Sequence, residues 1–174
     1  MMTEEIVTAR LVLIAITAET LASEQAGDGR LAELIGCEVG ASWPPVDWEP
    51  HVFLLLLAQM ERHPETIGWN RYVALRNADG TRSLIGVAGA FWREERPAEC
   101  EVGYTILAPH EGKGLATEAT LALIDLVRRD ARIESLIAHT FPALVGSVRV
   151  MEKCGFAFEG DGEEAGTVRY RRWL

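Results

Sequence analysis

The alternation of apolar and polar positions divides the chain into short strands and helices. Segments rich in leucine and β-branched residues, without a breaker, are typical of strands, whereas apolar positions that repeat every three or four residues are typical of helices. The expected strands are residues 8–16, 69–77, 83–92, 98–107, 133–141, 156–160 and 166–174. The expected helices are residues 17–25, 28–35, 50–62 and 146–154, with a further helix in the stretch 108–129.

The order of these elements predicts an α/β (α+β) fold. Two strands flank the sequence ADGT, which is a strong hairpin signal, and a third strand follows the charged turn REERPA. A strand-helix-strand crossover, a helix and a closing hairpin complete the order, which favours a mixed sheet covered by helices. With 174 residues, of which 48% are hydrophobic, we expect one compact domain over residues 1–174.

The expected helix at residues 50–62 is apolar on nearly every side. Its main apolar stripe consists of Phe53, Leu56, Leu57 and Met60. Because Leu54 and Leu55 lie off that stripe, we expect the helix to be covered on two sides. A substrate-side loop or a partner subunit would provide the second cover, so a homodimer and a buried helix both stay open.

The acidic balance of the chain restricts its partners. There are 17 basic and 26 acidic residues, a formal net charge of −9 and a pI near 5.0. Such a molecule repels polyanions, which argues against nucleic acid as a partner. A small phosphate ligand held by local amides stays compatible with this charge, and an acidic rim favours cationic substrates such as amines.

The cysteines, the histidines and the apolar runs exclude several other classes. Cys37, Cys100 and Cys154 are widely spaced, which is typical of buried thiols and not of a disulfide framework. The four histidines lack metal-ligand spacing, so we expect no metal. The longest apolar run, residues 52–58, falls far short of the roughly 20 residues that span a bilayer. The acidic start of the chain does not match a signal peptide, so we expect a cytoplasmic protein without a membrane partner.

The loop EGKGLA at residues 111–116 carries the strongest chemical signal. Its glycines allow close backbone approach, and the helix that follows offers unpaired N–H groups to an anion. The spacing excludes a P-loop, because Lys113 lies between the two glycines and no Ser or Thr follows it. A dinucleotide fingerprint is weak, because Thr117 occupies the position of its third glycine. An ordinary strand-to-helix turn stays open.

The same loop resembles the [Q/R]-x-x-G-x-[G/A] motif of the GNAT superfamily of acyl-CoA-dependent N-acetyltransferases. Gly114 and Ala116 occupy its fourth and sixth positions. Four stretches agree with this family in order and spacing: TARLVL, EVGYTI, GKGLATEA and SVRVMEKCGF. Together they resemble the RimJ/RimL-type branch, and the resemblance covers nearly the whole chain.

The resemblance implies a mostly antiparallel, splayed sheet of about seven strands and a place for acetyl-CoA as cosubstrate. The sheet would open between residues 98–107 and 133–141, with pantetheine paired to backbone near Ile106 and Leu107. The pyrophosphate would lie on the loop residues Glu111, Gly112, Lys113, Gly114, Leu115 and Ala116. Glu111 departs from the Gln or Arg of the family motif. Independently, Gly103 inside a solid strand indicates a bulge or a close backbone approach.

The implied reaction is direct attack of a primary amine on the thioester. The acceptor would be a protein N-terminal α-amine or a small-molecule amine. We expect Glu101 to act as the general base, directly or through a water, although it would serve equally as an ordinary strand carboxylate. A backbone N–H near residues 104–106 would polarise the carbonyl. The family's tyrosine acid is replaced by Met151, which leaves Ser147 to contact the cofactor and protonate the thiolate, or to cap its helix.

Several residues keep alternatives open. Glu111, Met151 and Leu144, which replaces a family asparagine, leave a non-catalytic acyl-CoA-binding module as the alternative function. The tryptophans that would line an acceptor pocket, or else the core, are Trp43, Trp48, Trp69 and Trp92. The segment SWPPVDW is the expected specificity region, and the REERPAE turn is expected to be a solvated tip.

Overall fold

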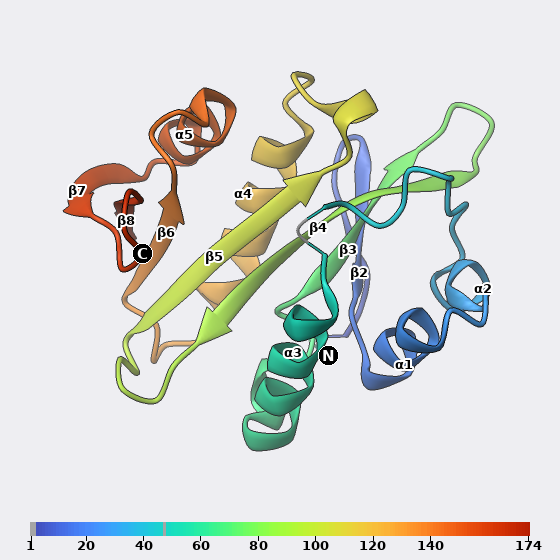
Figure 1. The fold of residues 1–174 in the computed structure, drawn as a ribbon, viewed down its shortest axis with the longest axis horizontal. Helices are drawn as coiled ribbons and strands as arrows, with labels where there is room; N and C mark the ends of the chain where they lie inside the picture. Colours follow the sequence, from blue (N-terminus) through green and yellow to red (C-terminus); the bar gives the residue numbers. More distant parts are fainter. Residues whose placement is uncertain (1–2, 47) are drawn as a thin grey trace.

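The chain folds around one twisted sheet with helices on both faces (Figure 1). The computed structural model describes residues 3–46 and 48–174, so Asp47 of the SWPPVDW segment lies outside the described residues. The strands are β1 (Ile6–Val7), β2 (Leu11–Ala15), β3 (Arg71–Arg76), β4 (Arg82–Trp92), β5 (Glu99–Ile106), β6 (Ser135–Thr140), β7 (Ala157–Asp161) and β8 (Val168–Trp173). The helices of four or more residues are α1 (Ala18–Ala26), α2 (Leu31–Ile35), α3 (Pro50–Arg62), α4 (Leu115–Val127) and α5 (Val145–Lys153).

The sheet has the order β1-β2-β3-β4-β5-β6-β8-β7. Neighbouring strands are antiparallel except β5 and β6, which are parallel. The predicted mixed, mostly antiparallel sheet is therefore confirmed. It has eight strands where about seven were expected, because a short strand β1 precedes the turn at Thr8 and pairs with β2.

The parallel pair β5 and β6 separates soon after it forms. Its register covers three residue pairs and ends at Glu101 opposite Ile137, although β5 continues to Ile106 and β6 to Thr140. In Figure 1, β6 leads to α5 while β5 runs away from it, so the ends of the two strands lie apart. The sheet therefore opens between β5 and β6, which are the two strands between which the opening was predicted.

Gly103 does not form the bulge that the sequence allowed. The register between β4 and β5 is continuous from Gly86–Ile106 to Trp92–Cys100, and Gly103 lies opposite Gly89. A Cβ atom built on Gly103 would meet no atom within 4 Å. The glycine therefore leaves open space on one face of β5, where any other residue would place a side chain.

Alternation along β5 assigns its side chains to two different faces. Cys100, Val102 and Ile106 join the hydrophobic core under α4. Because successive side chains point to opposite faces of a sheet, Glu101 and Gly103 belong to the other face. A second core, which contains residues of α1, α2 and α3, covers that face over β2, β3 and β4. Figure 1 shows α3 in front of the sheet and α4 behind it.

Helix α3 is covered less completely than its apolar sequence indicated. Phe53 and Leu56 are buried in the second core, in agreement with the predicted stripe. Leu54 and Leu55, in contrast, are 61% and 58% exposed. The expected second cover is therefore absent from the described residues, and Leu55 borders a cleft described below.

The three cysteines are free and buried, as predicted. Burial raises the pKa of the Cys37 thiol to about 11, that of Cys100 to about 12 and that of Cys154 to about 11. Within residues 3–46 and 48–174, no helix is long and apolar enough to cross a membrane.

Candidate active site

A loop with unpaired amides precedes helix α4. Gly112 and Gly114 have φ angles of 71° and 75°, a left-handed conformation that favours glycine. The N–H groups of residues 112–117 donate to no acceptor in the described part of the chain. Consecutive free amides at a helix N-terminus favour an anion such as a phosphate. This run contains the predicted residues Gly112, Lys113, Gly114, Leu115 and Ala116.

Two other residues expected at the cofactor use their amides elsewhere. The N–H of Glu111 donates to the Ala108 carbonyl at 3.2 Å, and that of Leu107 donates to the Ile85 carbonyl at 2.7 Å. Neither amide is therefore available to a phosphate or to pantetheine. Glu111 is exposed to solvent. The amides of residues 112–117 remain as the candidate anion donors of this loop.

An ion pair fastens this loop to the start of the chain. Glu118, in the first turn of α4, accepts from the Thr8 hydroxyl at 2.6 Å and from Arg10 Nε at 2.7 Å. Arg10 Nη1 also donates to the Lys113 carbonyl at 2.8 Å. Burial raises the pKa of Glu118, but the hydrogen bonds from Thr8 and Arg10 outweigh it and hold the pKa below its ordinary value. The TARLVL motif thus positions the loop.

The free edge of β5 lines the opening of the sheet. Leu107 N–H bonds to β4, so alternation turns the peptide groups of Thr105 toward β4 and those of Tyr104 and Ile106 toward the opening. Past the fork at Glu101, the structure pairs this edge with no other strand among the described residues. Two backbone N–H groups, those of Tyr104 and Ile106, are therefore placed to receive a chain or a carbonyl in the opening.

Tyr104 spans the opening on the α4 side of the sheet. Its hydroxyl donates to the Ser147 carbonyl oxygen at 3.0 Å and lies 3.4 Å from Ser147 Oγ. Burial raises the pKa of Tyr104 to about 12, so the phenol stays protonated near neutral pH. Helix α5 begins at Val145 with Leu144 as its N-cap. The expectation that Ser147 caps this helix is therefore wrong, since Ser147 lies inside its first turn.

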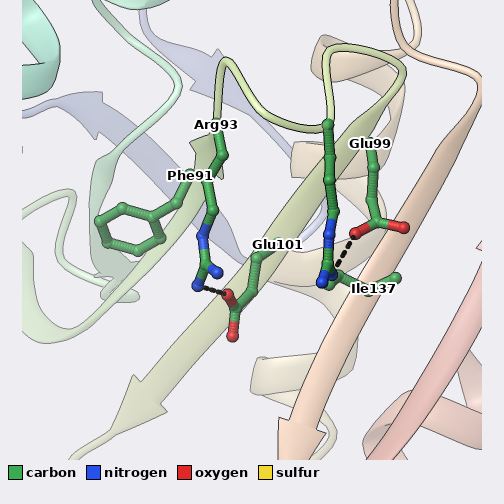
Figure 2. Close-up of a pocket in the computed structure, with 6 residues that line it drawn as sticks. Phe91, Arg93, Glu99, Glu101 and Ile137 are labelled. Atoms are coloured by element: carbon green, nitrogen blue, oxygen red, sulfur yellow. Dashed lines mark hydrogen bonds and ion pairs between the residues drawn. The ribbon is translucent and has the colours of Figure 1, made fainter. Parts of the chain in front are cut away.

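Glu101 lies at the fork on the α3 side of the sheet. Its carboxylate contacts the guanidinium group of Arg93 and the imidazole ring of His139. Its Oε2 is 2.7 Å from Arg93 Nη2, and its Oε1 is 2.8 Å from His139 Nδ1. Figure 2 shows Arg93 reaching down from the end of β4 to the carboxylate, with Phe91 beside it. A cavity of about 10 Å³ next to Glu101 and Ile137 has room for a single water. The predicted base therefore has a polar, partly enclosed setting.

A larger cleft of about 440 Å³ opens beside Glu101. This volume lies in the range of about 300–1,000 Å³ that is usual for small-molecule sites. Leu55 and Ala58 of α3 form one wall, and Phe91, Trp92 and Glu95 from the end of β4 form the other. The cleft thus joins an apolar surface to the Glu101 carboxylate on the face opposite the amide loop.

Of the four tryptophans expected to line an acceptor pocket, one lines this cleft. Trp92 does so, whereas Trp69 and Trp48 are buried in the two cores. The indoles of Trp43 and Trp48 donate to Glu24 Oε2 at 3.0 and 2.9 Å. Trp43 and Trp48 therefore have a structural role in the described part of the SWPPVDW segment, and the role of this segment in specificity stays a prediction.

The turn after β4 contributes more than a solvated tip. Arg93 binds Glu101 and also Glu163, at 2.9 Å, in the turn between β7 and β8. Arg96 pairs with Glu163 at 2.8 Å and with Glu99 at 3.2 Å. The two turns are thus linked across the α3 side of β5 and β6.

Sequence reasoning missed four contributors, namely Arg10, Arg93, Tyr104 through its hydroxyl, and His139. From the sequence, His139 was tested only for metal-ligand spacing, together with the other three histidines. Its position two residues after Ile137 places it on the Glu101 face of β6, a signal that becomes readable once the register of β5 and β6 is known. Among the described residues, no group of three or more His, Cys, Asp or Glu side chains is placed to hold a metal ion.

Comparison with known families identifies the class of protein. The family model described as the acetyltransferase (GNAT) domain matches residues 10–157, so the chain belongs to this family. Acetyl-CoA-dependent acetyl transfer is the activity that this family implies.

Individual relatives agree with this class. The chain is 37% identical over 59 residues to a probable N-acetyltransferase, YjcK, of Bacillus subtilis (strain 168), a match that covers 34% of this chain and 33% of YjcK. The matched part is thus about a third of that relative's length. A GnaT-family acetyltransferase from Bordetella pertussis superposes with a TM-score of 0.67 at 20% identity, covering 97% of this chain and 99% of that one.

A second solved structure is RimL, a ribosomal L7/L12 alpha-N-protein acetyltransferase in complex with coenzyme A. It superposes with a TM-score of 0.66 at 18% identity, over 98% of each chain. The residues of the present chain fit the same cosubstrate. Residues 112–117 offer free amides to a pyrophosphate, and the unpaired edge of β5 offers peptide groups to the amides of pantetheine.

Proposed function

We propose that this protein is a RimJ/RimL-type N-acetyltransferase that transfers the acetyl group of acetyl-CoA to a primary amine. One observation carries the proposal: the fork between β5 and β6 has a free amide loop at its open end and a held carboxylate, Glu101, at its base. The donor would occupy the opening from the α4 side. The acceptor would enter the cleft on the α3 side.

Glu101 is proposed to accept the proton of the attacking amine. A lysine-type amine has a reference pKa of about 10.4 and is protonated at neutral pH, so attack requires that this proton be removed. Gly103, two residues further along the same face, carries no side chain and leaves room for the amine next to the carboxylate. The cavity beside Glu101 would hold the water if transfer is indirect.

The opposite side of the fork would serve the leaving group. The backbone N–H groups of Tyr104 and Ile106 are proposed to polarise the thioester carbonyl, as donors that need no reorganisation. The hydroxyl of Ser147 is proposed to donate a hydrogen bond to the thiolate that leaves, and Tyr104, whose own proton goes to the Ser147 carbonyl oxygen, is proposed to position Ser147. Burial raises the pKa of Tyr104 to about 12, so the phenol keeps the proton that it donates to the Ser147 carbonyl oxygen, and Ser147 stays the proposed proton donor.

The acceptor class follows from the cleft and from the charge of the molecule. A net charge of −9 favours a cation, and the carboxylates of Glu94, Glu95 and Glu101 in the cleft outnumber the guanidinium groups of Arg62 and Arg93. The apolar wall formed by Leu55, Phe91 and Trp92 favours an acceptor with an apolar body next to its amine. Both a protein N-terminus and a small amine satisfy these conditions.

The test is titration calorimetry with acetyl-CoA, followed in the same sample by a thiol-release assay over a panel of amines and peptide N-termini. Binding with thiol release supports the proposal. Binding without release across the panel would favour the non-catalytic acyl-CoA-binding module. As a matched control, Gly114→Val places a β-branched residue at φ 75°, so it should abolish binding while the circular dichroism spectrum is kept. Retained affinity in this variant would reduce the loop to a turn.

A further inference from the structure

The Glu101 carboxylate is held from both neighbouring strands. Arg93, at the end of β4, occupies Oε2, and His139, on β6, occupies Oε1. Backbone pairing between β5 and β6 has already ended at Glu101 and Ile137. The bond from His139 to Glu101 is therefore a link between the two strands beyond their last backbone pair.

The imidazole of His139 is fixed by what surrounds it. Its side chain is 13% exposed, and a Cβ built on Gly162 would lie 3.1 Å from His139 Cδ2, so the turn between β7 and β8 packs against the ring. Its Nε2 is buried and has no hydrogen-bond partner among the described residues. The ring is thus largely enclosed, with the turn between β7 and β8 close to its Cδ2 edge.

The contact determines which ring nitrogen carries the proton. An ionised carboxylate accepts hydrogen bonds and donates none, so the short contact requires a proton on His139 Nδ1. A neutral ring protonated at Nδ1 leaves a bare lone pair at the buried Nε2. Burying a lone pair without a partner costs less than burying a charged N–H group without one. The arrangement thus places a proton on Nδ1, the nitrogen that faces Glu101.

We propose that His139 is a positioning residue for Glu101, and that its Nδ1–H holds the carboxylate toward the acceptor cleft. The inference rests on the proposed function, because Glu101 is the proposed base. Two donors, from β4 and β6, leave the carboxylate little rotational freedom about its side chain. A general base must lie within hydrogen-bond reach of the proton it takes, and a displacement of about 1 Å can cost up to ~10²-fold in rate.

The charged groups around the ring determine what else contributes. Glu101 faces the ring from β5, and Arg93 reaches it through Glu101 from the end of β4. Arg169, on β8, is the strand partner of His139, and Glu163 lies in the turn that packs on the ring. Among these groups, Glu101 alone forms a hydrogen bond with the imidazole. A substitution that removes this hydrogen bond therefore tests the proposed positioning role.

The kinetic test compares two substitutions of His139 in the full chain. In His139→Asn the side-chain amide can take the place of Nδ1 and donate to Glu101, whereas His139→Leu removes the donor. We expect His139→Leu to lower kcat by about tenfold to ~10²-fold with an unchanged KM for acetyl-CoA, and His139→Asn to recover most of it. His51→Leu, at an exposed histidine paired with Glu49, is the matched control and should keep parental kinetics.

A double-mutant cycle with Glu101→Gln separates positioning from an independent effect. If His139 acts through Glu101, His139→Leu has no further effect on kcat in the Glu101→Gln background. Additive losses would overturn the inference, as would parental rates in His139→Leu. If Glu101→Gln itself keeps the parental rate while thiol release proceeds, the base and the positioning role both fail but the transferase function survives.

A spectroscopic measurement tests the inference without turnover. The ¹⁵N shifts of the His139 ring in the free protein should report the Nδ1–H tautomer, and Glu101→Leu should abolish it. An Nε2–H tautomer in the parent protein would refute the proposal even if every variant were to fold and turn over poorly. Should the protein bind acetyl-CoA and acetylate no amine, the proposed function would fail while these spectra still decide the contact.

Discussion

The Tyr104 hydroxyl donates to the Ser147 carbonyl oxygen at 3.0 Å, and this contact joins β5 to α5 across the opening of the sheet. Tyr104 and Glu101 both belong to β5, but their side chains point to opposite faces of the sheet because side chains alternate along a strand. Met151, where the family pattern has a tyrosine, is buried in the core. A tyrosine hydroxyl therefore reaches Ser147 from a strand and not from the last helix.

Removing this hydroxyl should slow the reaction without unfolding the protein. In Tyr104→Phe the ring keeps its packing, so we expect kcat to fall by roughly tenfold, equivalent to about 1.4 kcal/mol, for the loss of the hydrogen bond that positions Ser147. Because burial raises the pKa of Tyr104 to about 12, its proton is present throughout the usual assay range, and the parent's pH–rate profile should show no basic limb from this phenol. Steady-state kinetics between about pH 6 and about pH 10, a range that includes typical amine pKa values, measure the change in kcat and the shape of the pH–rate profile. An unchanged kcat in Tyr104→Phe would remove the hydroxyl from the reaction.

Gly103 should be dispensable for folding and required for acceptor access. A Cβ at this position meets no atom within 4 Å, so Gly103→Val should change the melting temperature little. Its branched side chain would fill the space beside Glu101, and acetylation of bulky amines should fall by at least ~10-fold as proximity is lost. The affinity for acetyl-CoA, measured by calorimetry, should stay within twofold of the parent value, since the cosubstrate would lie on the other face.

Gly103→Ala is the graded control for this prediction. Its single methyl group should reduce the rate less than valine does, and small amines should be affected less than large ones. Equal activity of the three proteins on every amine would place the acceptor elsewhere than the space next to Gly103.

Much of the fold was predictable from the sequence, because local patterns determined it. The hairpin around ADGT, the helix after the glycine loop and the buried cysteines all follow from short-range signals. The resemblance to the GNAT family indicated the fork before the structure located it at Glu101 and Ile137. The resemblance thus supplied the long-range pairing that periodicity alone does not contain.

The partners of the site residues were not predictable, because they depend on register and on contacts between distant segments. Arg93 and His139 are separated from Glu101 by 8 and 38 positions and meet it through three adjacent strands. The contact between Arg10 and Lys113 spans 103 positions. Of the two expectations for Gly103, a bulge or a close backbone approach, the bulge is wrong because the register between β4 and β5 is continuous, and register cannot be seen in the sequence of one strand.

The Glu118 carboxylate should couple stability to pH. Because its pKa is lowered on folding, its ionised form stabilises the folded state above the ordinary value of 4.5, and this contribution is lost as the pH falls through the lower folded value. Glu118→Gln should therefore reduce the free energy of unfolding at pH 7 by about 1–2 kcal/mol, after allowance for solvent screening of Arg10. Urea titrations at pH 7 and at low pH should show the difference from the parent shrinking under acid.

The same variant should weaken acetyl-CoA binding, because Arg10 loses the partner that aligns it under the loop. Asp125→Asn, at an exposed helix position whose side chain is 71% accessible, is the matched control and should alter neither property. Parental affinity in Glu118→Gln would mean that the loop keeps its shape without the ion pair.

The cysteines of the native protein should react only slowly with thiol reagents. The thiol-release assay depends on this property, because it must detect the thiol of coenzyme A and not those of the protein. The thiolate is the reactive form, and burial raises the pKa values of Cys37, Cys100 and Cys154 to about 11, 12 and 11, so little thiolate exists at pH 8. A chromogenic disulfide reagent should label the folded chain slowly and, after denaturation, all three cysteines. Cys37→Ser, Cys100→Ala and Cys154→Ala would assign any residual labelling. Rapid labelling of a folded, monodisperse sample would contradict the burial of the cysteine concerned, and Cys154, next to the Thr117 carbonyl at 3.7 Å, would then report opening of the loop helix.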